Sequence, residues 1–71
     1  MDEFSQGVFF AASVLVRIHD LPTEAADILN EAGLVKADIS SLDDYEKEAM
    51  RELVKSEGSR LNFIGLEAGH E

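Results

Sequence analysis

The stretch that decides the fold is Val8-Phe9-Phe10-Ala11-Ala12-Ser13-Val14-Leu15-Val16, in which Ser13 is the single polar residue. Around it, apolar residues recur at spacings of four and three, and the recurring set is Phe4, Val8, Ala11, Leu15 and Ile18. This periodicity is typical of one face of an α-helix, so it predicts a helix over residues 3–19. Gly7 lies inside that helix and costs up to about 1 kcal/mol relative to Ala, unless a neighbour packs closely against it.

This helix is apolar on more than one side. The face expected to be buried groups six residues, namely Phe4, Val8, Ala11, Ala12, Leu15 and Ile18. One apolar flank holds Phe9 and Val16, the other holds Phe10 and Val14, and a narrow polar strip is formed by Gln6, Ser13 and Arg17. A chain of 71 residues builds one small core and covers such a helix with difficulty.

Three arrangements of this helix remain open. The rest of the chain wraps it completely, or one flank mediates self-association, or one flank binds another protein. Exposed apolar surface in a small protein indicates a partner, and two-fold dimers are the commonest oligomers. We therefore expect either the Phe9/Val16 flank or the Phe10/Val14 flank to be an interface, and we expect a homodimer.

Turn and cap residues predict two further helices. Pro22 suits the first turn of a helix over residues 22–32, and Gly33 followed by Leu34 is typical of a Schellman termination. Ser41, with Ser40 as the alternative, is predicted to cap a third helix over residues 42–57. The apolar stripe of this third helix is Leu42, Tyr45, Ala49 and Leu53, widened by Met50 and Val54.

The remaining apolar segment is Arg60-Leu61-Asn62-Phe63-Ile64-Gly65-Leu66. It is too short for a helix and is interrupted by Gly65, so it either folds back over the bundle or pairs as a strand with a second chain. Residues 67–71 are expected to fray. The predicted fold is a single all-α domain of three helices with an extended apolar C-terminal strip.

Charge restricts the partners. Fifteen acidic and six basic residues give a net charge of −9, which disfavours direct contact with nucleic acid or with anionic membranes. Basic partners are favoured, including proteins that themselves bind nucleic acid. Asp43, Asp44, Glu48 and Glu52 are candidate interface residues, although a solvated helix face explains the same pattern.

Compartment and chemistry follow from what the sequence lacks. With no Cys there is no disulfide or thiolate metal site, and the acidic start and the short apolar run argue against a signal peptide or a membrane span. We therefore expect a cytoplasmic protein. His19 and Asp20 are adjacent at a predicted helix end, where neighbouring side chains usually point apart. No catalytic, cofactor or metal site is expected, and the chain is not expected to be an enzyme.

The order of an apolar helix, Asp20-Leu21-Pro22-Thr23-Glu24-Ala25-Ala26 and Glu31-Ala32-Gly33-Leu34 resembles small accessory proteins encoded by bacteriophages and prophages. The resemblance covers Phe4 to Leu34, less than half of the chain, and no functional residues carry over from it. It implies a short acidic protein that binds and inhibits or redirects a host protein in the bacterial cytoplasm. The alternative is an assembly subunit that docks through its apolar first helix.

Overall fold

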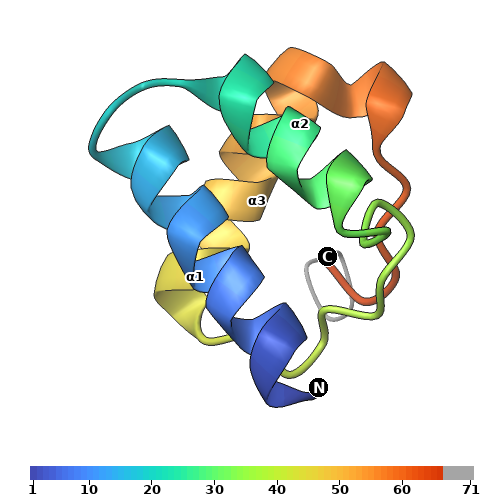
Figure 1. Cartoon of the computed structure of the whole chain (residues 1–71). Helices are drawn as coiled ribbons and strands as arrows, with labels where there is room; N and C mark the ends of the chain where they lie inside the picture. Colours follow the sequence, from blue (N-terminus) through green and yellow to red (C-terminus); the bar gives the residue numbers. More distant parts are fainter. Residues whose placement is uncertain (67–71) are drawn as a thin grey trace.

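The computed structural model describes residues 1–66 and contains three α-helices in that range: α1 (Glu3–Arg17), α2 (Pro22–Glu31) and α3 (Asp44–Glu57) (Figure 1). A single 3-10 turn, η1 (Gly58–Arg60), follows α3. Each helix packs against the other two. The all-α, three-helix class predicted from the sequence is confirmed, and the expected fraying of residues 67–71 lies outside the described residues.

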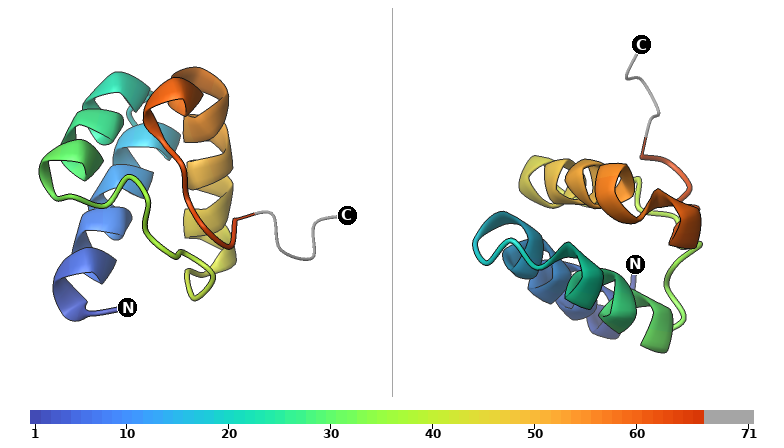
Figure 2. Two further views of the ribbon diagram at one scale, coloured as in Figure 1. Left: turned by 90° about the vertical axis from the view of Figure 1, so that its right-hand side faces the viewer. Right: turned by 90° about the horizontal axis from the view of Figure 1, so that it is seen from above.

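The helices form two layers. Seen from above in Figure 2, α1 and α2 lie together and α3 crosses on one side of them. The sides of α1 and α2 that face away from α3 therefore have no helix of this chain, within residues 1–66, packed over them. This arrangement determines which apolar side chains of α1 are buried.

Aspartates begin α1 and α3. The Asp2 carboxylate accepts a hydrogen bond from the backbone N–H of Ser5 at 2.8 Å, and the Asp43 carboxylate accepts one from the N–H of Glu46 at 2.8 Å. Each bond satisfies an amide that has no partner within the helix. The predicted cap at Ser41 is wrong, because the helix begins two residues later than expected, at Asp44.

The end of α2 follows the prediction closely. Gly33 adopts a left-handed φ of 75°. The N–H of Leu34 donates to the carbonyl of Leu29 at 2.9 Å, and the N–H of Gly33 donates to that of Asn30 at 3.1 Å. These two bonds form a Schellman motif, which satisfies the last carbonyls of the helix.

The end of α1 differs from the prediction. The helix stops at Arg17, two residues earlier than expected. The chain then turns through Asp20, which has a positive φ of 55°. The N–H of Leu21 returns to the carbonyl of Leu15 at 2.9 Å. His19 consequently lies in the turn rather than in the helix.

The C-terminal strip folds back within the chain, which was one of the two predicted alternatives. It runs parallel to the 35–39 connector, with one bridge between Asp38 and Ile64 (Figure 2, left). The N–H of Asn62 donates to the carbonyl of Val35 at 2.8 Å, and the N–H of Ile39 donates to that of Ile64 at 2.8 Å.

Gly65 allows the strip to lie close to the connector. Its φ is 90°, and a Cβ atom there would lie 2.9 Å from the Cβ of Ser40. A larger residue would therefore strain the backbone and clash with it. Beyond this turn, Leu66 is buried in the core.

The core lies between the two layers and beneath the strip. Its largest fully buried side chains are Phe9, Leu29, Ile39, Met50 and Leu53. The face of α1 predicted to be buried is largely wrong: Phe4, Ala11 and Ile18 are exposed, Val8 and Leu15 are half-buried, and Ala12 alone is fully buried. The inward side instead carries Phe9, Ala12, Ser13 and Val16.

Candidate functional site

One predicted interface flank belongs to the core. Phe9 is fully buried and its ring meets the edge of Phe63 with centroids 5.8 Å apart, while Val16 is 7% exposed. Neither side chain is available to a partner of the folded chain, so the prediction of an interface at Phe9 and Val16 is wrong. The adjacent Ser13, predicted to be in the polar strip, is also buried, and its hydroxyl donates to the Phe9 carbonyl at 2.7 Å.

The other predicted flank is accessible. Phe10 is 57% exposed and Val14 is half-buried. On the same outward side of α1 lie Gly7, Ala11 and Ile18, all exposed. We call these five residues, Gly7, Phe10, Ala11, Val14 and Ile18, the α1 ridge.

The four acidic candidates near α3 have different roles. Asp43 caps the helix. Glu48 pairs with Arg51, three residues later on the same helix, at 2.8 Å. Glu52 contacts Arg17 of α1 at 3.9 Å.

Asp44 is the remaining member of this set. It is exposed, and its side chain makes no hydrogen bond or ion pair with residues 1–66. Asp44, Glu48 and Glu52 share a row on α3 because they are spaced four apart. Since two of the three carboxylates contact an arginine of the same chain, the row offers a partner less negative charge than the sequence suggests.

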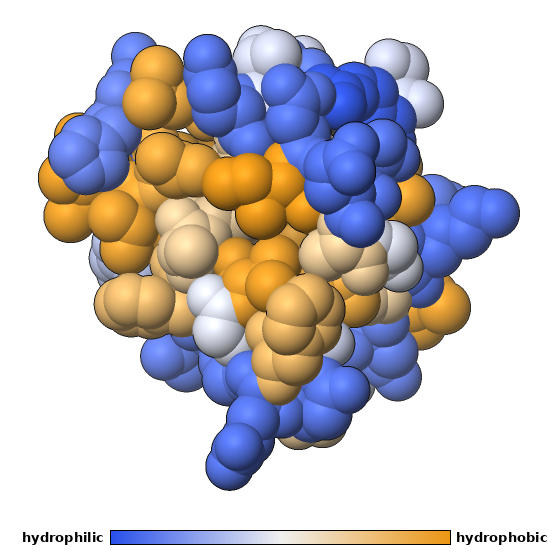
Figure 3. Space-filling view, viewed as in Figure 1, coloured by the Kyte–Doolittle hydropathy of each residue, from blue (hydrophilic) through white to orange (hydrophobic). Residues whose placement is uncertain are grey.

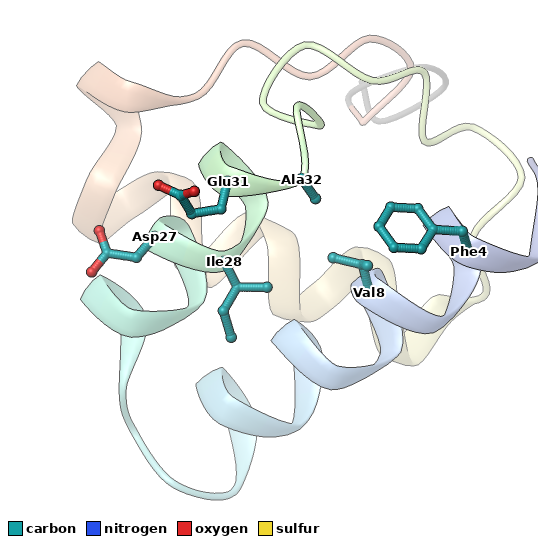
Figure 4. Close-up of a pocket in the computed structure, with 6 residues that line it drawn as sticks. All are labelled: Phe4, Val8, Asp27, Ile28, Glu31 and Ala32. Atoms are coloured by element: carbon teal, nitrogen blue, oxygen red, sulfur yellow. The ribbon is translucent and has the colours of Figure 1, made fainter.

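The predictions made from the sequence missed a groove that the structure forms between α1 and α2. Phe4 and Val8 on α1 face Ile28 and Ala32 on α2 across a volume of about 390 Å³ (Figure 4). Phe4 is 65% exposed and Ile28 is 39% exposed. We call this feature, with Asp27 and Glu31 at its edge, the α1–α2 groove.

The groove has an acidic edge. Asp27 and Glu31 both extend from α2 beyond Ile28 (Figure 4). Asp27 is paired with Arg60 at 2.6 Å, and this hydrogen bond raises the pKa of the Arg60 guanidinium above its ordinary value. Glu31 is exposed and contacts no cation of the chain within residues 1–66, so its charge is available to a partner.

The groove and the ridge form one apolar surface. Figure 3 shows apolar side chains across α1 and its junction with α2, bordered by hydrophilic residues. Phe4 lies where the two features meet. Contiguous exposed apolar area of this kind is rare on monomeric proteins and marks interaction surfaces.

A signal for the groove was present in the sequence. The apolar residues Ala25, Ala26, Ile28 and Leu29 of α2, together with its C-cap residue Ala32, form a broad apolar face for a helix of 10 residues. The structure buries Ala25, Ala26 and Leu29 fully and turns Ile28 to the edge. An apolar face broader than one packing contact is the pattern that predicts a second, unfilled contact.

A second missed feature links α1 to α3. Glu46 is only 4% exposed, and its carboxylate accepts hydrogen bonds from the Gln6 amide at 3.1 and 3.3 Å. Buried carboxylates need hydrogen-bond donors, and Gln6 supplies one from the neighbouring helix. Because these hydrogen bonds join the two helices, they help to fix the packing of α1 on α3.

In residues 1–66 there is no group of three or more His, Asp or Glu side chains that could hold a metal ion. His19 is exposed, and its ring makes no hydrogen bond within that range. Over the same residues, every helix is too short or too polar to cross a membrane. The apolar surface is therefore the strongest candidate site.

Comparison with protein-family models, with curated proteins and with solved structures gave no match to this chain.

Proposed function

We propose that this protein is a protein-interaction module that binds an apolar, basic helical segment of another protein in the α1–α2 groove. The observation that carries the proposal is the groove itself, in which Phe4 and Ile28 are exposed and Val8 is half-buried, beside the available carboxylate of Glu31. An amphipathic helix places apolar side chains in such a groove at three- and four-residue spacing.

Charge supports a basic partner. The chain carries a net charge of −9, and Glu24, Asp27 and Glu31 follow one another along the exposed side of α2. Complementary charge raises the rate of association and disfavours acidic competitors. A lysine or arginine flanking the apolar positions of the bound helix would lie beside Glu31.

The biological role proposed for this binding is that of an accessory protein that blocks or redirects its target. The resemblance of residues 4–34 to bacteriophage and prophage accessory proteins supports this role, and the target would then be a basic or nucleic-acid-binding protein of the bacterial host. An acidic chain that occupies a basic helix of such a protein prevents that helix from contacting its own ligand.

Binding in the groove is tested with a defined probe. The isotope-labelled protein is titrated with an amphipathic helical peptide that carries leucines at i, i+3, i+4 and i+7 and lysines elsewhere. We expect chemical-shift changes at Val8, Ile28 and Ala32, and smaller ones on α3. A scrambled peptide of the same composition is the control, because it keeps the charge and loses the apolar face. Equal responses to both peptides would mean that charge alone attracts them.

The role in cells is tested with matched variants in a bacterial lysate. Ile28→Glu adds a charge in the groove, whereas Asn30→Glu adds the same charge at an exposed position of α2 outside the groove lining. One stoichiometric basic protein should be captured by wild type and by Asn30→Glu, and lost with Ile28→Glu. Capture that is unaffected by Ile28→Glu contradicts the groove as the binding site, and recovery of virion or complex components instead indicates an assembly role.

A further inference from the structure

The groove does not account for the α1 ridge. Phe10 is 57% exposed and Ile18 is 67% exposed, so both of these ridge side chains are open to solvent. Among residues 3–17 the only charged side chains are Glu3 and Arg17, at the two ends of the helix. The middle of the ridge is therefore an uncharged apolar surface on a chain of net charge −9.

Gly7 is the unusual residue of this surface. It lies inside α1, where glycine is a poor helix former. A Cβ atom added there would meet nothing within 4 Å, so no close contact inside the described chain requires glycine. Ala11, one turn later, is also exposed. Two small residues one turn apart allow the backbone of a second helix to approach closely, as happens where helices cross.

We propose that the α1 ridge is a homodimer interface, in which α1 packs antiparallel against α1 of a second copy, with Gly7 of each copy against Ala11 of the other. This proposal is independent of ligand binding in the groove, although Phe4 lies beside both surfaces. The exposed ridge is the surface that would be covered, and the distribution of charge favours a second copy of the chain in the antiparallel orientation.

Charge favours a second copy in this orientation. Two chains of net charge −9 repel each other, and this repulsion is weakest when the contact contains no acidic side chain. The middle of the ridge contains none. Antiparallel packing brings Glu3 of one copy towards Arg17 of the other, at both ends of the contact, where Arg17 also contacts Glu52 and the Tyr45 ring of its own chain. Parallel packing would instead place Glu3 against Glu3 and Arg17 against Arg17.

The size of the contact predicts a reversible dimer. A standard stable interface buries about 800 Å² on each partner. The ridge is one face of a helix of 15 residues, so we expect its contact to be smaller than that. Dimerisation should therefore depend on concentration, and the helices should separate on dilution.

The first test is the mass of the protein by light scattering after size-exclusion chromatography, from micromolar to millimolar concentration. We expect the mass to rise from 7.8 kDa towards twice that value. A mass of 7.8 kDa at every concentration overturns the proposal. Ile28→Glu, which tests the groove, should dimerise like wild type, so failure of one surface is distinguishable from failure of the other.

Gly7→Lys is the decisive variant. A lysine fits the monomer, because the space at Gly7 is open and lysine is a good helix former, but it fills the position where the second helix approaches. We expect Gly7→Lys to remain a monomer with wild-type circular dichroism. Asn30→Lys adds the same charge on the exposed side of α2 and should dimerise normally. Normal dimerisation of Gly7→Lys overturns the proposed contact.

Orientation is tested with cysteines, since the chain has none. Gly7→Cys and Ala11→Cys are oxidised separately and as a mixture. A disulfide requires Cα atoms about 4.4–6.8 Å apart. In the proposed dimer, position 7 of one copy lies opposite position 11 of the other. The two positions 7 are then four residues apart, or about 6 Å along the helix axis, and so are the two positions 11. The mixture should cross-link faster than either variant alone. Faster cross-linking of the separate variants indicates parallel helices and overturns the antiparallel arrangement.

Discussion

The first and third helices differ in how clearly their sequences indicate a buried side. In α3 the charged residues lie mostly on the outer side, with Glu46 as the buried exception. The apolar stripe predicted from the sequence holds Ala49, Met50 and Leu53, all fully buried, although Tyr45 of that stripe is 39% exposed. In α1 the apolar residues extend almost all the way round, and the face predicted to be buried is largely exposed. Periodicity therefore predicts that a helix forms, whereas contrast between its sides predicts how it packs.

The size of Phe9 and the hydrogen bond of Ser13 explain which side of α1 is buried. Phe9 fills the centre of the core and meets the edge of Phe63. Burying the neighbouring Ser13 leaves no polar atom unsatisfied, because its hydroxyl donates to the Phe9 carbonyl. A serine whose hydroxyl bonds to its own helix can therefore be buried. For this reason the polar strip did not indicate which side of α1 faces solvent.

The largest expected effect separates the two sides of α1. Phe9→Ala removes the central buried ring, and we expect it to lower the free energy of unfolding by about 3–5 kcal/mol. Phe10→Ala, its neighbour on the exposed ridge, should change that free energy by no more than about 0.5 kcal/mol in dilute solution. Urea unfolding followed by circular dichroism measures both. Equal losses for the two variants would mean that α1 does not have the orientation described here.

A smaller effect tests the start of α3. Asp43→Ala removes the carboxylate that accepts the Glu46 N–H, and we expect a loss of about 1 kcal/mol in the free energy of unfolding. Asp44→Ala removes a charge from the first turn without removing that bond, so its effect should be about 0.5 kcal/mol or less. Thermal unfolding of the two variants compares them. A larger loss for Asp44→Ala would contradict the assignment of Asp43 as the cap.

The sequence predicted local features better than it predicted the site. Gly33 and Leu34 gave the end of α2 correctly, because a Schellman motif depends on a few neighbouring residues. The groove depends instead on how Val8 of α1 and Ile28 of α2 approach each other in space. The broad apolar face of α2 indicates an additional contact, but neither residue alone distinguishes a core position from a groove wall. The residues that line the groove therefore could not be predicted from the sequence.

The same limit applies to the predicted interface residues. Phe9 and Phe10 are adjacent and chemically identical, and the sequence placed them on alternative flanks without deciding between them. Only the position of α3 and the strip shows that Phe9 is covered and Phe10 is not.

Gly7 provides a test with the opposite sign. Gly7→Ala should raise the free energy of unfolding of the monomer by about 0.5–1 kcal/mol, because alanine is a better helix former and its Cβ would meet no atom within 4 Å. Dilute samples are used so that association does not contribute. Gly58→Ala is a useful comparison, since a Cβ there would lie 3.6 Å from a Val54 methyl, an ordinary contact. Destabilisation by Gly7→Ala would reveal a close contact at this position.

The smallest expected effect concerns pH and the start of α1. The hydrogen bond from Ser5 lowers the pKa of the Asp2 carboxyl below 3.8, its ordinary value. Since the folded pKa lies below the unfolded one, ionised Asp2 stabilises the helix above pH 3.8, and this contribution is lost as the pH falls through the lower folded value. Asp2→Asn keeps a capping oxygen without a titrating group, so it should lose less stability than wild type on acidification over this range. Direct titration of the Asp2 carboxyl by NMR measures the pKa. A value at or above 3.8 would mean that Asp2 does not hold the first turn of α1, so that α3 alone would begin with an aspartate cap.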